Sequence, residues 1–150
     1  ALAHDPAYAA KAQRVSELTR DLSELLPDLV PNLKRKMHKR PATQLAFHPP
    51  CTLQHGQQLR GGVEAHLNEL GFNVQVAPAD SHLCCGSAGT YSVLQPVLSE
   101  QLKKNKLAAL ATERPAVIAT ANIGCQSHLA AASGVPVVHW ITLLENAASR

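Results

Sequence analysis

Residues 116–128 read Ala-Val-Ile-Ala-Thr-Ala-Asn-Ile-Gly-Cys-Gln-Ser-His, and this stretch decides the fold. Its first part, Ala116–Thr120, is predicted to form a strand. A short helix is predicted to begin at Cys125 and to end at Gly134. A strand that leads into a helix and then into another strand is typical of a parallel sheet with right-handed crossovers.

The same alternation of strand and helix extends over the chain from Thr43 onward. Further strands are expected at Gln44–Phe47, Phe72–Ala77 and Val135–His139. Helices are expected from Leu59 to Leu70, from about Thr90 to Thr112 with an interruption at Pro96, and from Ile141 to Ala148. The pattern therefore predicts an α/β, Rossmann-like fold, with a mainly parallel four-stranded sheet and flanking helices.

The first part of the chain, residues 1–42, is predicted to be an N-terminal helix followed by a basic connector. Val15, Leu18, Leu22 and Leu25 recur at helical spacing, and Pro27 and Pro31 are expected to end that pattern. The remaining residues, 43–150, are expected to form the functional domain. The chain opens with Ala1, so a fragment of a longer protein is expected.

Composition fits one globular domain with a hydrophobic core: 150 residues, 45% apolar and 17% charged. No apolar run has the length of a membrane-spanning helix, and no secretory or transit segment is recognisable. The net charge of +3 comes from residues 34–40, which hold five basic residues and no acid. That run is interpreted as a solvated linker, or else as a contact with an anionic membrane surface or an acidic subunit. No nucleic-acid reader motif accompanies it.

The four cysteines are Cys51, Cys84, Cys85 and Cys125. With no export signal, they are interpreted as reduced, cytoplasmic thiols rather than a disulfide framework. Cys51 follows the first expected strand, the adjacent pair follows the second, and Cys125 follows the third. Because the strand-to-helix loops of a parallel sheet emerge at its carboxyl edge, these thiols are expected to converge there. His139, at the end of the fourth strand, should reach the same edge.

The pair Cys84-Cys85 suits a metal or iron–sulfur centre better than a disulfide, since adjacent side chains point apart. Gly86 allows a tight turn and a close approach of the backbone to a cofactor. Cys125 and His128 lie at positions i and i+3 of one helix, so both should face the same way. Thiolates and imidazole are ligands of zinc and of iron–sulfur clusters. The predicted metal ligands are therefore Cys51, Cys84, Cys85, Cys125 and His128.

Other interpretations remain beside this one. Cys51 or Cys125 alone could be an ordinary buried cysteine, and His128 alone a surface histidine. A thiol–disulfide enzyme using Cys84 and Cys85 is disfavoured by their geometry. His48, His55 and His82 are treated as candidates for hydrogen bonds around the site, not as ligands. No P-loop, dinucleotide-binding, HExxH or GxSxG motif occurs, and no catalytic residue is expected.

The cysteine pattern resembles the cysteine-rich CCG domain family, which occurs in the heterodisulfide reductase B subunit and in iron–sulfur subunits of flavin-linked dehydrogenases. Residues 80–91, together with residues 47–51 and 122–128, are similar to iron–sulfur subunits of bacterial glycolate oxidases. The resemblance covers nearly the whole chain. It implies the C-terminal one of two tandem CCG domains, with ferredoxin-like clusters elsewhere in the parent chain.

The resemblance also implies electron transfer through an iron–sulfur cluster, expected to be 4Fe-4S. A flavin-containing subunit would oxidise the 2-hydroxy acid, and the iron–sulfur subunit would pass the electrons onward toward quinone. A cytoplasmic location is expected, peripheral on the inner face of the cytoplasmic membrane. Many CCG domains end in Cys-x-x-Cys, whereas the last position here is His128. A four-cysteine centre, a cluster with a histidine ligand and a zinc site therefore remain open. The rival function is a structural zinc domain that joins subunits, and the isolated domain could be recovered empty.

Overall fold

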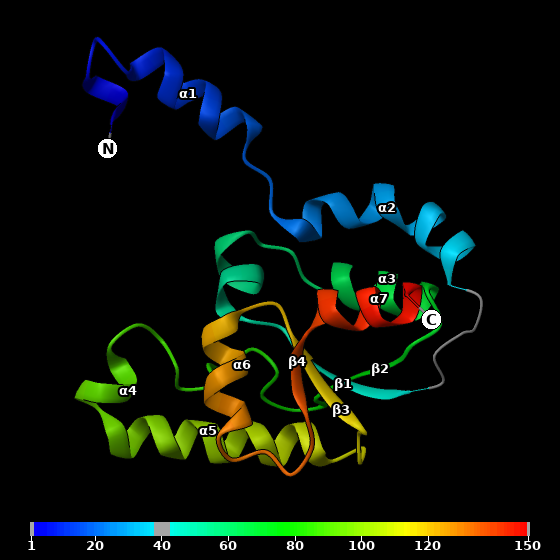
Figure 1. Cartoon of the computed structure of the whole chain (residues 1–150). Helices are drawn as coiled ribbons and strands as arrows, with labels where there is room; N and C mark the ends of the chain where they lie inside the picture. The colour runs from blue at the N-terminus through cyan, green and yellow to red at the C-terminus, as the bar shows by residue number, and fades with distance from the viewer. Residues whose placement is uncertain (1, 38–42, 150) are drawn as a thin grey trace.

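A four-stranded parallel sheet organises the molecule (Figure 1). The computed structural model describes residues 2–37 and 43–149. The strands are β1 (Gln44–His48), β2 (Asn73–Val76), β3 (Val117–Thr120) and β4 (Val137–His139), in the spatial order β2-β1-β3-β4. All three strand pairs are parallel. The predicted fold class is thereby confirmed.

Helices connect the strands and extend the chain at both ends. They are α1 (Ala9–Leu18), α2 (Leu22–Lys36), α3 (Gly62–Glu69), α4 (Tyr91–Leu94), α5 (Pro96–Ala111), α6 (Ile123–Ala130) and α7 (Trp140–Ala148). A 3-10 turn at Leu2–His4 and a π-helical turn at Thr52–Gly56 complete the set among the described residues. Pro96 separates α4 from α5, as predicted. Helix α6 begins two residues before the predicted start and ends at Ala130, short of Gly134.

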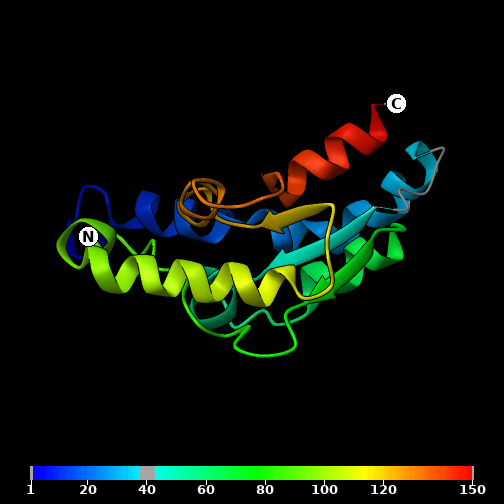
Figure 2. The ribbon, with the colours of Figure 1, turned by 90° about the horizontal axis from the view of Figure 1, so that it is seen from below.

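The two faces of the sheet are covered by different helices (Figure 2). The side chains of Leu45 and Phe47 pack on one face against α2, α3 and α7, where Leu26, Leu67 and Trp140 are buried. The opposite face is covered by α5 and α6, which bury Leu110, Cys125 and Leu129 together with Ala46 and Ile118 of the strands. Alternate residues of each strand therefore face different cores, as the two-residue side-chain period requires.

Helix α2 corrects the prediction that Pro27 and Pro31 end the N-terminal helix, because both prolines lie inside it. They stand four residues apart on the exposed side, where solvent is able to satisfy the carbonyl groups that proline leaves without a donor. The opposite side buries Leu26 and Val30 in the core. The buried side and a capping box at Asp21 and Glu24 thus stabilise a helix that the two prolines oppose.

The predicted basic connector is likewise partly helical. Lys34–Lys36 form the last turn of α2, where positive charge complements the helix dipole. Lys34 Nζ lies 2.7 Å from Glu69 Oε1 of α3. Lys39 and Arg40 of the predicted run lie outside the described residues.

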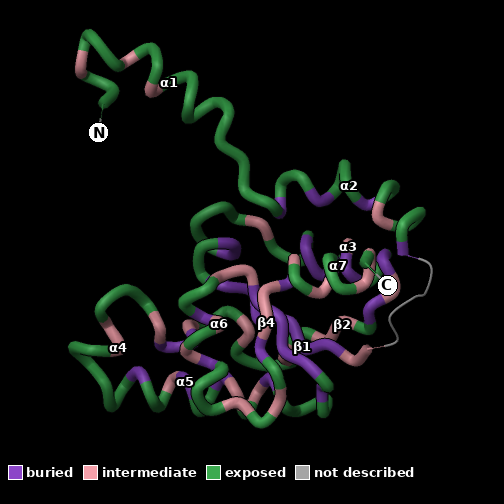
Figure 3. The backbone as a smooth tube through the Cα atoms, viewed as in Figure 1, coloured by how far each residue is buried: buried purple, intermediate pink, exposed green. Residues whose placement is uncertain are grey.

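Helix α1 contributes no buried residue (Figure 3). Val15 and Leu18, which share the helical spacing of the N-terminal segment, are 65% and 62% exposed. This helix is therefore not part of the hydrophobic core. Within residues 2–37 and 43–149, no helix combines the length and the apolar character that crossing a membrane requires.

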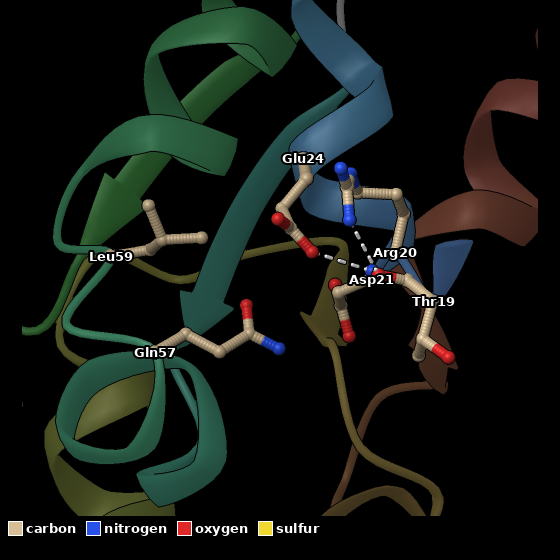
Figure 4. Close-up of a pocket in the computed structure, with 6 residues that line it drawn as sticks. All are labelled: Thr19, Arg20, Asp21, Glu24, Gln57 and Leu59. Carbon is tan, nitrogen blue, oxygen red and sulfur yellow. Dashed lines mark hydrogen bonds between the residues drawn. The ribbon is translucent and has the colours of Figure 1, made fainter. Parts of the chain in front are cut away.

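The start of α2 is anchored to the segment that follows the π-helical turn (Figure 4). Glu24 accepts a hydrogen bond from the Asp21 backbone at 2.7 Å, and Ser23 Oγ, which donates to Asp21 Oδ1 at 2.6 Å, lies 3.3 Å from Gln57 Oε1. A cavity of about 480 Å³ opens here, lined by Thr19, Arg20, Asp21, Glu24, Gln57 and Leu59. It contains no cysteine or histidine, so it is separate from the predicted metal site.

Glu64 of α3 is buried at 7% exposure, and its Oε2 has no hydrogen-bond partner among the described residues. Burial raises the pKa of this carboxyl above its ordinary value of 4.5. The folded protein therefore binds this proton more tightly than the unfolded chain. Its contribution to stability falls as pH rises through that ordinary value and on through the raised pKa of the folded state.

We therefore expect Glu64→Gln to be more stable than the wild type at about pH 7, with an advantage that nearly disappears at about pH 4. The free energy of unfolding from urea titrations at both pH values measures this. Glu69→Gln is the control on the same helix. Hydrogen bonding to Lys34 lowers the pKa of Glu69, so its substitution should destabilise at neutral pH. An advantage of Glu64→Gln that does not depend on pH would contradict the assignment.

Candidate metal centre

The strand order reverses beside β1, and the site lies at this reversal. The chain passes from β1 to β2 on one side and later returns to place β3 on the other side of β1. In such sheets, ligands bind beyond the carboxyl ends of the strands, where the connections diverge. Cys51 follows β1 and Cys125 follows β3, so both thiols are delivered to this crevice.

Cys51 is placed by Pro49 and Pro50 at the end of β1, directly before the π-helical turn. Such turns are rare and often occur at functional sites. The Cys51 side chain is exposed, and its thiol lies next to that of Cys84. Partial desolvation of the thiol at the cavity wall is the main cause that raises the pKa of Cys51, followed by the charge of Cys84.

Cys84 and Cys85 belong to the irregular loop of residues 77–90 between β2 and α4. Cys84 is half-buried, whereas Cys85 is only 1% exposed and packs in the core beneath α5 and α6. The loop thus inserts one of its two thiols into the interior and leaves the other at the surface of the crevice.

Cys125 lies in the first turn of α6, at 8% exposure. Asn122 caps this helix: its Oδ1 accepts hydrogen bonds from the backbone of Gly124 at 2.9 Å and of Cys125 at 3.2 Å. The cap explains why α6 begins earlier than predicted.

Cys85 and Cys125 form a coupled pair of thiols. Hydrogen bonding between them lowers the pKa of Cys85 and raises that of Cys125. Ser87 joins them, with its Oγ 3.2 Å from Cys85 Sγ and 3.8 Å from Cys125 Sγ. One sulfur of the pair is thereby stabilised as a thiolate, which is the form that binds metals.

Three of the four thiols line a cavity of about 500 Å³. Its walls are Pro50, Cys51, Thr52, Cys84, Ser87, Ala88, Gly89, Asn122, Gly124 and Cys125. Cys85 lies behind this wall, in contact with Cys125. The structure therefore brings all four cysteines, from three strand-to-helix connections, to one place. Which of them bind a metal stays a prediction.

His48 is the histidine that lies among the thiols. One of its ring nitrogens and the sulfur atoms of Cys85 and Cys125 all lie within 4.8 Å of one another. The sequence predicts only a hydrogen-bonding role for His48. The predicted strand ends at Phe47, whereas β1 includes His48. A strand that ends at His48 places its side chain on the same face as that of Ala46, toward α5 and α6.

His128 lies elsewhere, behind the loop. Its Nε2 is 3.3 Å from Ser99 Oγ, and Ser99 Oγ donates to the Gly86 carbonyl at 2.8 Å. Because that hydroxyl has a single proton, the His128 Nε2 must be the donor toward Ser99. The structure does not place His128 in the group of His48, Cys85 and Cys125.

The other predicted histidines lie apart from this group. His55 Nε2 lies 3.5 Å from the His82 carbonyl at the surface. His139 accepts from the Ile141 backbone as the cap of α7.

Comparison with known proteins gives the family. Residues 45–130 match the family described as the CCG cysteine-rich domain. The chain belongs to the CCG cysteine-rich domain family. The predicted family resemblance is thereby confirmed, and the match covers all four cysteines.

Among individual relatives, the glycolate oxidase iron-sulfur subunit of Escherichia coli K12 is 52% identical over 146 residues, 97% of this chain and 35% of that protein. Lactate utilization protein A of Bacillus velezensis is 30% identical over 127 residues, 81% of this chain and 50% of that protein. The protein of the same name from Geobacillus kaustophilus is 29% identical over 127 residues, again 81% of this chain and 50% of that protein. The chain thus spans about a third to a half of these relatives.

Gly86 fixes the conformation of the irregular loop of residues 77–90, which is called the CCG loop below. Its φ of +95° is a conformation that side chains disfavour, and its backbone N–H donates to Cys84 Sγ at 3.3 Å. A Cβ at this position would overlap the backbone oxygen of Ser99 and lie 3.1 Å from His128 Nε2. Only glycine therefore lets the CCG loop pack this closely on α5.

We expect Gly86→Ala to lower the free energy of unfolding by roughly 2–5 kcal/mol, since it adds both backbone strain and a clash with backbone. Gly134→Ala is the control, because its Cβ would meet nothing within 4 Å; it should change stability by less than about 1 kcal/mol. Urea denaturation of the metal-free, reduced proteins measures both. Equal effects of the two substitutions would contradict the argument.

Lys106 of α5 holds the CCG loop through two hydrogen bonds. Its Nζ donates to the carbonyl of Asp80 at 2.5 Å and to that of Ser81 at 3.3 Å, and the residue is 3% exposed. Burial lowers the pKa of this amine, and the negative charge of Cys85 opposes the lowering. A buried positive charge therefore lies close to the thiols.

We expect Lys106→Met to loosen residues 77–90, because both hydrogen bonds to the loop are lost. The free energy of unfolding should fall by about 1–3 kcal/mol, and proteolytic cleavage within the loop should accelerate. Lys103→Met is the matched control: Lys103 is similarly buried, but its Nζ pairs with Glu100 of the same helix at 2.6 Å. If Lys103→Met accelerated loop cleavage equally, the assigned role of Lys106 would be wrong.

Proposed function

We propose that this CCG domain binds an iron–sulfur cluster and transfers electrons within an oxidoreductase. The observation that carries the proposal is the convergence of four thiols, of which Cys51, Cys84 and Cys125 line one cavity of about 500 Å³ and Cys85 lies behind its wall. Cysteine thiolates are the usual ligands of such clusters. The 52% identity to a protein named as an iron-sulfur subunit supports the same conclusion.

The residues present fit such a group. Cys51 and Cys84 line the open side of the cavity and Cys125 its buried side, while Cys85 lies behind Cys125 and is favoured as a thiolate. Backbone N–H groups at the start of α6 and the amine of Lys106 supply positive potential against the negative charge of thiolates. A bound cluster, which we propose to be 4Fe-4S, would supply one-electron chemistry, and the domain itself would not oxidise substrate.

The wider assignment is also a proposal. We propose that the domain acts with flavin-containing subunits that oxidise glycolate or a related 2-hydroxy acid, and with ferredoxin-like clusters elsewhere in its parent chain. The names of the E. coli and Bacillus relatives, which refer to glycolate and lactate, support this. A cytoplasmic location at the inner face of the membrane, near quinone, is supported only by the basic last turn of α2.

The central prediction concerns iron and sulfide. Anaerobic reconstitution of the chain with ferrous iron and sulfide should give acid-labile sulfide, stoichiometric iron and, after reduction or oxidation, an EPR signal. Cys85→Ser should lose most of the iron, because Cys85 is the most buried thiol and is held as a thiolate. The far-UV circular dichroism of metal-free Cys85→Ser, compared with that of the metal-free wild type, controls for folding.

Elemental analysis of protein isolated without oxygen separates the two candidate metals. About one equivalent of zinc without iron would overturn the redox role and would favour a structural domain that joins subunits. The wider assignment is tested in the assembled complex: glycolate or lactate should reduce the cluster of this domain, as followed by EPR. Substrate oxidation that leaves the cluster oxidised would contradict the proposed electron path.

A further inference from the structure

His48 is a buried imidazole that faces the Cys85 thiol and helps to lower its pKa. It is 1% exposed, and neither ring nitrogen meets hydrogen-bond geometry with any atom of the described residues. An imidazole always carries at least one polar nitrogen that needs a partner, and leaving it without a well-formed hydrogen bond in the interior is energetically costly. Such a group in a native protein calls for an explanation, and a bound ion is one.

The position of His48 indicates what that partner is. Its ring nitrogen converges with the sulfur atoms of Cys85 and Cys125, within 4.8 Å, and all three residues are buried. The three donors come from β1, from the CCG loop and from α6, so they surround a point rather than lie along one element. One imidazole nitrogen and two thiolates are a donor set that zinc and iron both accept.

A second unpaired group lies beside the first. Thr120 is the register partner of His48 on the neighbouring strand, it is completely buried, and its Oγ1 has no partner among the described residues. Both side chains share the sheet face of Ala46 and Ile118, which carries Cys85 and Cys125. Two adjacent buried polar groups without partners, next to two thiols, mark a polar site built into an otherwise apolar core.

We propose that His48 is a direct ligand of the metal centre, together with Cys85 and Cys125. It thereby takes the histidine role that the Cys-x-x-His spacing predicted for His128. His128 already has a partner in Ser99, which holds the Gly86 carbonyl, so His128 positions the CCG loop. This inference rests on the proposed metal-binding function and deepens it, because it names the ligand that makes this centre a mixed one.

The first test uses Co²⁺ as a probe of metal-free, reduced protein, followed by its absorption bands. Loss of a residue that only orients a ligand weakens metal binding by about 10–100-fold. Loss of a direct ligand should exceed that, so we expect His48→Gln to weaken Co²⁺ binding by more than about 100-fold. His48→Cys, which supplies another ligand, should restore affinity to within about tenfold. His128→Gln, the matched control, removes a residue that only positions the CCG loop, so it should weaken Co²⁺ binding by no more than about 100-fold.

The second test does not depend on how a His48 variant folds. The reconstituted wild type and His128→Gln should both show strong nitrogen hyperfine coupling in pulsed EPR, and histidine labelled with ¹⁵N should change that coupling. Where His48→Cys folds, its coupling should disappear and its midpoint potential should fall, because histidine ligation raises the potential relative to thiolate. Absence of histidine coupling in the wild type, or its loss in His128→Gln, would overturn the proposal. So would a weakening of Co²⁺ binding by about 100-fold or less in His48→Gln, because a residue that only orients a ligand accounts for an effect of that size.

The two tests fail in different ways. If no cluster forms but Co²⁺ binding depends on His48, the iron–sulfur function is wrong and the ligand assignment stands. If a cluster forms without histidine coupling, the function stands and the ligand assignment is wrong.

Discussion

The metal centre depends on the way in which the chain connects its strands around β1. One connection leads to β2 on one side of β1, and the next leads back to β3 on the other side. Right-handed crossovers that move in opposite directions along a sheet must lie on opposite faces, so α3 covers one face while α5 and α6 cover the other. A crevice therefore remains above the carboxyl ends of β1 and β3. Cys51 and Cys125 border it, and the CCG loop, fastened by Lys106, spans it and inserts Cys85.

Much of this arrangement could be predicted from the sequence, because it follows from period and topology. Strands and helices alternate clearly after Thr43, and a parallel sheet delivers its loops to one edge. The convergence of Cys51, the vicinal pair and Cys125 therefore needed no knowledge of side-chain packing. The family resemblance rested on the same residues and is confirmed by the match over residues 45–130.

What escaped prediction depends on tertiary contacts that no local pattern encodes. The i, i+3 spacing places His128 and Cys125 on one helix face, yet Ser99 of α5 binds His128 instead. His48 was assigned a supporting role because a strand ending at Phe47 leaves its direction open. Helix α2 continues through Pro27 and Pro31 because Leu26 and Val30 are buried on its opposite side, a gain that only the folded neighbours provide. The ligand roles of the site residues remain predictions.

The buried side of the centre also has a mechanical consequence. His48 and Thr120 end two strands that are joined by the central hydrogen-bonded ladder, and Cys125 is held by a capped helix. Donor atoms fixed in this way shift little when the charge between them changes, so the nuclear rearrangement that accompanies each electron stays small. Cys51 and Cys84, on the open side, are more exposed. The centre thus has buried donors held by regular elements on one side and thiols that solvent reaches on the other.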